Sequence, residues 1–331
     1  MKNSHLDSIE QSEFGKIAKM KINYSTLPIC RMTKGSCAKA ILLFCLFLFG
    51  CIESRPIQFG VVADVQYADK PTASGRHYAE SLPELERCVS DFNRDELAFV
   101  IQLGDLIDGG PNAAAQLRTT TAVYDQLRMP HYHVLGNHDF GGIDRTSTMD
   151  ILGLQRGYYR FDIRDWRFIV LDTQDWAIYG GWAEDSPQYR AAVQMLDALK
   201  AAGAPNAMDW NGGFGDEQLA WLEAELTDAD RSDKRVIVFG HLPLMPVDEL
   251  HAAWNGQAVV SIFEKYGCVK AYLCGHNHQG GYVQHNGIHY ITLEAMVNAA
   301  GKDGAWATVT LFGNEISIEG FGAVTTRTLR L

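Results

Sequence analysis

The sequence predicts an α/β fold for residues 55–331, organised as one domain. Short apolar runs typical of strands alternate with segments whose apolar residues recur at helical spacing, and this alternation is the pattern of an α/β chain. No internal repeat is visible, and no Gly/Ser-rich linker divides this part of the chain. The hydrophobic fraction of 47% and the charged fraction of 21% are those of an ordinary globular protein.

The predicted strands are short apolar runs separated by polar, Gly-containing or Asp-containing segments. They cover residues 57–63, 99–103, 132–135, 158–163, 167–171, 235–239, 269–274, 288–293 and 305–312. The pair 158–163 and 167–171 is expected to form a hairpin that turns at Arg164-Asp165. The last third of the chain contains more predicted strands than helices.

Three helices have recognisable starting residues. Ser81 is the expected N-cap of a helix whose apolar side chains recur at helical spacing up to Phe92. Ser186-Pro187 is an N-cap and first-turn pair that opens a helix running to about Ala201. Asp216 is expected to cap a third helix, which presents leucines on one face.

Charge and cysteine content exclude several classes of protein. The 40 Asp and Glu residues against 29 Lys and Arg give a formal net charge of −11, so a non-specific nucleic-acid binder, which needs a basic surface, is disfavoured. The seven cysteines form neither a disulfide framework nor a zinc spacing. Cys88, Cys268 and Cys274 are expected to be small buried hydrophobes. Nothing in the sequence indicates an oligomeric state.

Residues 1–51 form an N-terminal extension that contains an apolar segment at 40–51. The run Ala40 to Phe49 is too short to cross a bilayer core, which needs about 20 residues, and it matches the apolar region of a secretory signal. It ends in Leu48-Phe49-Gly50-Cys51, which resembles a bacterial lipoprotein signal. We therefore expect a cell-envelope protein that is lipid-anchored through Cys51. An uncleaved anchor and a cytoplasmic protein remain the alternatives.

Polar side chains follow five of the predicted strands, at the point where each strand ends. Open α/β sheets place their ligands at this edge. Asp, Asn, Gln and His donors suit Mn²⁺, Fe²⁺ or Zn²⁺ rather than a thiolate-bound metal. One such cluster is usually a turn or a cap, but five in order indicate a metal site. The clusters are Asp64-Val65-Gln66, Gly104-Asp105-Leu106-Ile107-Asp108, Gly136-Asn137-His138-Asp139, Gly240-His241 and Gly275-His276-Asn277-His278.

These motifs resemble the calcineurin-like metallophosphoesterase superfamily, whose pattern is D-x-H, G-D-x-x-D, G-N-H-[DE], G-H and G-H-x-H. The resemblance covers residues 56–331. It implies two packed mixed β-sheets flanked by helices, a four-layer sandwich. It also implies two divalent metal ions, one held by Asp64, Gln66 and His278, the other by Asn137, His241 and His276, with Asp105 bridging both.

Gln66 is the one departure, since most of the superfamily has His at this position. One branch carries D-x-Q there, the manganese-dependent ADP-ribose/CDP-alcohol diphosphatases, and the resemblance to that branch extends to further segments. These are 61–69, Trp210-Asn211-Gly212-Gly213-Phe214, 218–222, His241-Leu242-Pro243, 253–255, 280–282 and 293–294. The branch implies Mn²⁺ as the preferred ion, with Fe²⁺ or Zn²⁺ as alternatives. A neutral amide oxygen is a weaker ligand than imidazole, so the metal at Gln66 is expected to exchange more easily.

The resemblance implies a hydrolase that cleaves the pyrophosphate bond of ADP-ribose and of CDP-alcohols such as CDP-choline, by attack of a hydroxide that bridges the two ions. His138 is then the residue that stabilises or protonates the departing oxygen. Asp108 is expected to orient His138, or alternatively to cap the next helix. Gly109-Gly110 stands where the protein phosphatases of the superfamily have a phosphate-clamping Arg, which disfavours that substrate class.

The candidates for binding the nucleoside are the aromatic-rich insert, residues 174–214, and the region around Tyr67 and Tyr78, with Asn211 and Phe214 as the expected substrate contacts. The aromatic residues at these places are equally compatible with packing. The alternative functions are a phosphodiesterase or monoesterase with the same metals, including one for cyclic nucleotides, and a catalytically silent surface-binding lipoprotein. The expected partner is a small nucleotide diphosphate, with no nucleic acid and with membrane contact only through the N-terminal anchor.

Overall fold

The computed structural model describes residues 55–247 and 249–331. The expected signal segment at 40–51, with Cys51, lies outside the described residues. The described part forms one compact unit with two six-stranded sheets. The first sheet has the order β14 (Arg327–Arg330), β13 (Glu315–Gly322), β12 (Ala305–Phe312), β1 (Ile57–Val62), β2 (Phe99–Gln102) and β3 (His131–His133). The second has the order β10 (Gln279–His285), β11 (Ile288–Glu294), β9 (Val269–Cys274), β8 (Arg235–Phe239), β5 (Trp166–Val170) and β4 (Tyr159–Ile163).

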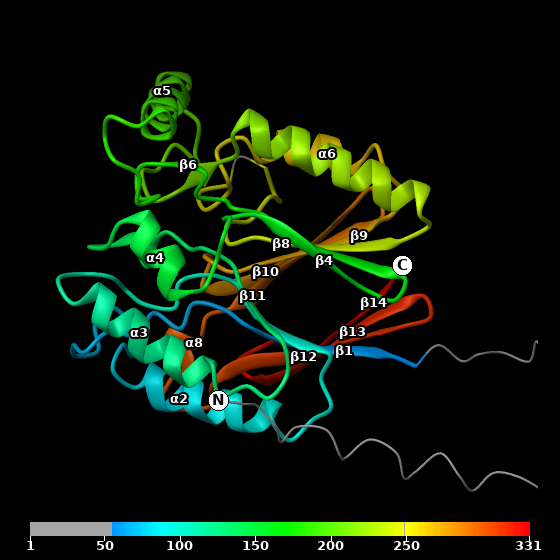
Figure 1. Cartoon of the computed structure of the whole chain (residues 1–331), viewed down its shortest axis with the longest axis horizontal. Helices are drawn as coiled ribbons and strands as arrows, with labels where there is room; N and C mark the ends of the chain where they lie inside the picture. Colours follow the sequence, from blue (N-terminus) through cyan, green and yellow to red (C-terminus); the bar gives the residue numbers. More distant parts are fainter. Residues whose placement is uncertain (1–54, 248) are drawn as a thin grey trace, which may run out of the picture. The chain divides into compact units, whose positions relative to one another are not determined.

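Helices cover the outer faces of both sheets, as Figure 1 shows. α2 (Ser81–Phe92) and α3 (Ala113–Tyr124) lie on the side of the first sheet, and α6 (Asp216–Arg231) packs on the second. The remaining helices are α4 (Arg145–Ile151), α5 (Pro187–Ala202), α7 (Gly256–Phe263), α8 (Met296–Ala299) and the 3₁₀ turn η1 (His138–Phe140). A small ladder joins β6 (Trp176–Ala177) to β7 (Gly212–Gly213). The prediction of two mixed β-sheets flanked by helices is confirmed. None of the helices in the described ranges is long and apolar enough to cross a membrane.

Both sheets are mixed, and their parallel parts bring the functional ends of the strands together. β1, β2 and β3 are parallel neighbours, while β12 runs antiparallel to β1. In the second sheet β5, β8, β9 and β11 are parallel neighbours, and β4 and β10 are antiparallel edge strands. The carboxyl ends of the central strands therefore meet at one edge of the sandwich.

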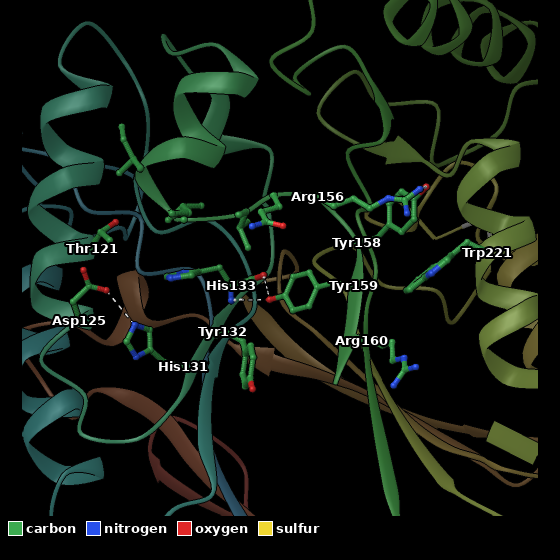
Figure 2. Close-up of a pocket in the computed structure, with 15 residues that line it drawn as sticks. Thr121, Asp125, His131, Tyr132, His133, Arg156, Tyr158, Tyr159, Arg160 and Trp221 are labelled. Carbon is green, nitrogen blue, oxygen red and sulfur yellow. Dashed lines mark hydrogen bonds and ion pairs between the residues drawn. The ribbon is translucent and has the colours of Figure 1, made fainter. Parts of the chain in front are cut away.

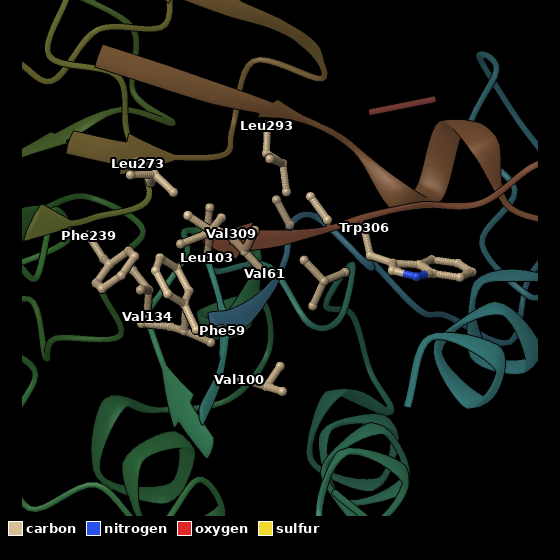
Figure 3. Packing of buried hydrophobic residues seen from close by; sticks show 14 of the residues in the cluster. Phe59, Val61, Val100, Leu103, Val134, Phe239, Leu273, Leu293, Trp306 and Val309 are labelled. Atoms are coloured by element: carbon tan, nitrogen blue, oxygen red, sulfur yellow. The ribbon is translucent and has the colours of Figure 1, made fainter. Parts of the chain in front are cut away.

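The core between the two sheets is built on stacked phenylalanines. Phe59 of β1 stacks on Phe99 of β2 with ring centroids 4.7 Å apart, and both contact Phe168 of β5 and Phe239 of β8 edge-on. Figure 3 shows Phe59 and Phe239 next to each other within this cluster. All four side chains are fully buried. Their packing fixes the two sheets relative to each other. It thereby also fixes the relative positions of the strand ends that each sheet contributes to the shared edge.

Phe99→Ala is expected to lower the free energy of unfolding by about 3–5 kcal/mol, because it leaves a cavity at the sheet–sheet interface. Urea denaturation followed by circular dichroism measures the change. Phe312→Ala is the matched control, since the Phe312 side chain is 50% exposed. An equal loss in both variants would contradict the assignment of Phe99 to the core.

Two predicted helix caps are wrong by one residue. Ser81 is the first residue of α2 rather than its N-cap; Glu80 holds that position, and the Ser81 hydroxyl donates to the Tyr78 carbonyl. Asp216 likewise begins α6, and Gly215 is its N-cap. The Ser186-Pro187 start of α5 is confirmed, because Ser186 Oγ accepts from the Tyr189 N–H.

The two-residue strands β6 and β7 have no counterpart in the predictions, and neither do three strands of the two six-stranded sheets, namely β10, β13 and β14. They lie at or next to sheet edges and carry Gly, Glu, Arg and His side chains that alternate with few apolar residues. β10 and β14 lack a strand signal of their own, so pairing with β11 and with β13 decides their structure. β13 does alternate, with Ile316 and Ile318 buried between more exposed residues, and the prediction missed this signal. The predicted hairpin formed by β4 and β5 is confirmed.

Candidate metal centre

The loops that follow the central strands hold backbone conformations that are rare for residues other than glycine. Asp64, Gln66, Asp105 and His276 all have positive φ, between 43° and 67°. Such conformations cost free energy and cluster at functional sites, where they turn side chains toward one point. Gly136 passes so close to Asp105 that a Cβ there would overlap the carboxylate. The positive φ values and the close contact between Gly136 and Asp105 both bring polar side chains together at the edge of the sheet.

Four of the predicted ligands converge in one group. His241 Nε2 lies 3.2 Å from Asn137 Oδ1, 3.2 Å from His276 Nδ1 and 3.4 Å from Asp105 Oδ2. All four side chains are buried. The donor atoms of Asp105, His241 and His276 lie within 4.8 Å of one another, a spacing that one metal ion can span.

The other predicted ligands form a second group that shares Asp105. Gln66 Nε2 lies 3.0 Å from Asp105 Oδ2 and 3.3 Å from His278 Nε2, and His278 Nε2 lies 3.6 Å from Asp64 Oδ1. The structure thus brings all seven predicted ligands together, in the two sets that the sequence indicates. Asp105 is the carboxylate common to both sets.

Each histidine in the two groups is held by an oxygen behind it. His241 Nδ1 faces the Leu103 carbonyl at 2.8 Å, His276 Nε2 faces Asn211 Oδ1 at 3.0 Å, and His278 Nδ1 faces Asn298 Oδ1 at 2.5 Å. Because such oxygens only accept, the nitrogen that faces them carries the proton. The opposite nitrogen of each ring therefore directs its lone pair into the cluster, as a metal-binding imidazole requires.

Gln66 provides the sharpest test of whether a cation fits. Its Oε1 is buried without a hydrogen-bond partner, while its amide Nε2 points between Asp105 and His278. A positively polarised NH₂ group thus lies between a carboxylate oxygen and the ring nitrogen of His278. A cation there would be bound by the same two acceptor atoms, and Oε1 would become a third ligand once the amide is turned over. The residues present fit two divalent cations.

The charges of the cluster also favour bound cations. Burial raises the pKa of Asp64 to about 7, and the neighbouring charge of Asp105 acts in the same direction. Burial alone would lower the pKa of His241, but Asp105 raises it to about 9. Burial lowers the pKa of His278 to about 4. In the absence of metal, the raised pKa lets His241 carry the positive charge that offsets the buried Asp105, and divalent cations would supply that charge instead.

His138 and Asp108 lie together beside the cluster. His138 begins η1 directly after Asn137; its Nδ1 is 3.0 Å from the Asp108 carbonyl and 3.4 Å from Asp108 Oδ1, and its side chain is 28% exposed. The Asp108 carboxylate also pairs with Lys70 and lies 3.9 Å from Arg76. The alternative role for Asp108, a helix cap, is not observed, because Asn112 is the N-cap of α3.

Asp139 is a structural residue of the site that sequence reasoning assigned no role. Its carboxylate is fully buried and accepts from the backbone N–H groups of Asp105, Leu106 and Gly136 at 2.8–3.0 Å. It therefore fixes the loop that presents Asp105. Its position directly after Asn137-His138 is the sequence signal for it.

The predicted substrate contacts are wrong as direct contacts, because both side chains are buried. Asn211 is fully buried; besides facing His276, its amide donates to the Asn206 and Leu250 carbonyls. Phe214 is 1% exposed and belongs to the apolar core of the second sheet. Asn211 orients a candidate metal ligand, and Phe214 packs behind it.

A cavity of about 620 Å³ lies away from the cluster, beside the edge strands β3 and β4 (Figure 2). Its walls include His131, Tyr132, Tyr159 and Trp221 and contain none of the seven converging side chains. His131 is already paired with Asp125, and the Tyr159 hydroxyl is bonded to the backbone of His133. The cavity is therefore separate from the two ligand groups at the ends of the central strands.

A family model described as calcineurin-like phosphoesterase matches residues 57–280, which include all five motifs. The chain belongs to this family. A manganese-dependent ADP-ribose/CDP-alcohol diphosphatase of Arabidopsis thaliana is 34% identical over 82% of this chain and 96% of the relative. The enzyme of the same name from Mus musculus is 31% identical over 83% of this chain and 93% of its own length.

Comparison with solved structures supports the assignment of the chain to this family. A dimetal phosphatase from Danio rerio superimposes with a TM-score of 0.75 at 30% identity, covering 83% of this chain and 98% of that one. GAP50 of Plasmodium, at 15% identity and a TM-score of 0.56, shares the fold. The predicted resemblance to the calcineurin-like phosphoesterases and to their diphosphatase branch is confirmed, and the protein is a metal-dependent hydrolase of that family.

Asn211→Ala and Asn298→Ala are expected to weaken metal binding about 10- to 100-fold, because each frees one ligating histidine to rotate. Asn211 supports His276 and Asn298 supports His278, so each variant should weaken a different one of the two sites. Calorimetric titration with Mn²⁺ separates the two. Asn286→Ala, at an exposed turn, is the control. Unchanged affinity at both sites in both variants would contradict the assignment.

Proposed function

We propose that this calcineurin-like phosphoesterase hydrolyses the pyrophosphate bond of nucleoside diphosphates linked to a sugar or an alcohol, such as ADP-ribose and CDP-choline, with Mn²⁺ as its preferred ion. The observation that carries the proposal is the pair of ligand groups that share Asp105, with Gln66 in one of them. The names of the relatives that are 31–34% identical support the substrate class. AMP and ribose 5-phosphate would be the products from ADP-ribose.

Two divalent ions, when bound, polarise the phosphoryl oxygens and lower the pKa of bound water. Asp64, Gln66 and His278 would hold one of them, Asn137, His241 and His276 the other, and Asp105 both. The His138 N–H of the backbone donates to Asp105 Oδ1 at 2.9 Å, which fixes the bridging carboxylate relative to the turn that carries the imidazole. The ligand shell and the imidazole are thereby one rigid unit.

His138 supplies the proton that the departing phosphate oxygen needs. Asp108 contacts Nδ1 of the ring through its carbonyl and its carboxylate, so the Nε2 side remains for the substrate. The partly exposed ring lies at the mouth of an otherwise buried cluster. Proton donation by a positioned imidazole typically contributes about 10²- to 10⁴-fold to the rate.

Steady-state turnover of ADP-ribose, CDP-choline and bis-p-nitrophenyl phosphate by residues 55–331 with Mn²⁺ tests the proposal. This range holds the whole described core, which forms one compact unit. We expect kcat/KM for the two nucleotides to be far above that for the diester. Turnover of the diester alone would withdraw the nucleotide claim and favour a phosphodiesterase. A silent binding protein would be expected to lack ligands, and all seven are present.

We further propose that the protein is held in the cell envelope by a lipid on Cys51. The support is the apolar run at 40–49 followed by Gly50-Cys51 in the sequence. Fractionation of cells that express the full chain and its Cys51→Ala variant tests this: the unchanged chain should sediment with membranes and the variant should not. Equal distribution of both would favour an uncleaved anchor or a cytoplasmic protein.

A further inference from the structure

The insert, residues 174–214, borders the metal cluster on two sides. At its carboxyl end Asn211 contacts His276, which belongs to one ligand group. At its amino end the segment around Trp182 packs against Phe140, two residues after His138, through the side chain of Arg145. β6 and β7 join these two ends of the insert. In Figure 1 the insert with α5 and β6 lies beside α4, which begins at Arg145.

Arg145 uses nearly all of its guanidinium to hold the amino end of the insert. The side chain donates to the carbonyls of Gly180 at 2.9 Å and Gln174 at 3.3 Å, and it pairs with Asp172 at the end of β5. Its backbone N–H donates to the Gly181 carbonyl at 3.0 Å. These contacts span the first turn of the insert, and the Arg145 residue is 6% exposed.

The same guanidinium stacks between the insert and the catalytic turn. Its carbon lies 4.3 Å from the centre of the Trp182 ring and 5.2 Å from the centre of the Phe140 ring. Gly181 completes the contact, since a Cβ there would overlap the Phe140 ring and the Arg145 backbone. Only a planar, multi-donor cation can bond two carbonyls and a carboxylate while it contacts two rings, so lysine is not an equivalent residue.

We propose that Arg145 is a positioning residue that latches the insert to the His138 turn and thereby favours nucleotide-sized substrates over small phosphate esters. The proposal rests on the proposed function. A small diester needs the ligand groups alone, whereas a nucleoside diphosphate extends beyond them. The insert borders the cluster on both the His276 and the His138 side, so its position relative to the cluster decides how the larger substrate fits.

Arg145→Lys tests the latch, with Arg167→Lys as the matched control. Arg167 is equally buried, and its partners Asp162, Glu225 and Asp228 belong neither to the insert nor to the ligand groups. We expect Arg145→Lys to lower kcat/KM for ADP-ribose about 10- to 100-fold, mainly through KM, with bis-p-nitrophenyl phosphate turnover little changed. Arg167→Lys should lower the Tm and leave the ratio between the two substrates unchanged.

Hydrogen exchange gives a readout that does not depend on activity. Amides in residues 174–182 should exchange faster in Arg145→Lys than in the unchanged chain, and Arg167→Lys should leave them protected. Trp182→Leu removes the stacking partner from the insert side and keeps the test open if Arg145→Lys does not fold. A parallel loss on both substrates, or unchanged exchange in 174–182, would overturn the latch. If the unchanged chain hydrolyses the diester but not ADP-ribose, the proposed function fails, and hydrogen exchange still decides the latch.

Discussion

Asp105→Asn is expected to lower kcat/KM for ADP-ribose by on the order of 10³-fold. Asp105 is the carboxylate common to both ligand groups: its Oδ2 lies 3.0 Å from Gln66 Nε2 and 3.4 Å from His241 Nε2. An amide there removes a negative charge that both cations share and offers a single acceptor oxygen. Metal-assisted charge stabilisation amounts to several kcal/mol, and each 1.36 kcal/mol corresponds to about tenfold in rate.

The metal content of the variant distinguishes this reason from a folding defect. We expect Asp105→Asn to retain its Tm in the absence of metal and to bind fewer than two Mn²⁺ per chain by elemental analysis. Asp125→Asn, at an exposed residue outside the cluster, should keep both ions and full activity. Two bound ions together with normal turnover in Asp105→Asn would show that the carboxylate does not bridge.

His138→Ala is expected to lower kcat for ADP-ribose by about 10²- to 10⁴-fold while Mn²⁺ binding stays intact. The imidazole lies beside the ligand groups and contacts Asp108 rather than the donors of the cluster. Its absence should therefore leave both cation sites formed. The loss should be much smaller for bis-p-nitrophenyl phosphate, because a nitrophenolate departs without a proton.

Comparison of the two substrates distinguishes proton donation by His138 from other roles of this residue. His285→Ala, on β10 where the side chain is 43% exposed and pairs with Glu264, is the control and should leave both activities unchanged. Equal losses on ADP-ribose and on the nitrophenyl diester would indicate that His138 acts by stabilising charge on the transferred phosphoryl group rather than by proton donation. Loss of Mn²⁺ would instead place His138 among the ligands.

The sequence alone determined which polar side chains follow the ends of the central strands of this protein. Asp64, Gln66, Asp105, Asn137, His241, His276 and His278 are local features, each directly after an apolar run, and a parallel sheet must bring such ends to one edge. Gln66 further placed the chain in one branch of the calcineurin-like phosphoesterases, as the relatives then showed. The edge strand β14 escaped prediction because Leu329 is its only apolar residue and carries no strand signal without the paired neighbour β13.

Only the tertiary structure decided which way individual side chains face. Asn211 and Phe214 lie in a matching motif, yet packing turned one onto His276 and buried the other in the core. Asn298 and Arg145 drew no attention in the sequence, since their partners, His278 and the turn around Trp182, are distant along the chain. Strand periodicity and motif spacing are properties of neighbouring residues, whereas burial and side-chain contacts depend on which distant segments meet. That physical difference separates what the sequence determines from what the fold adds.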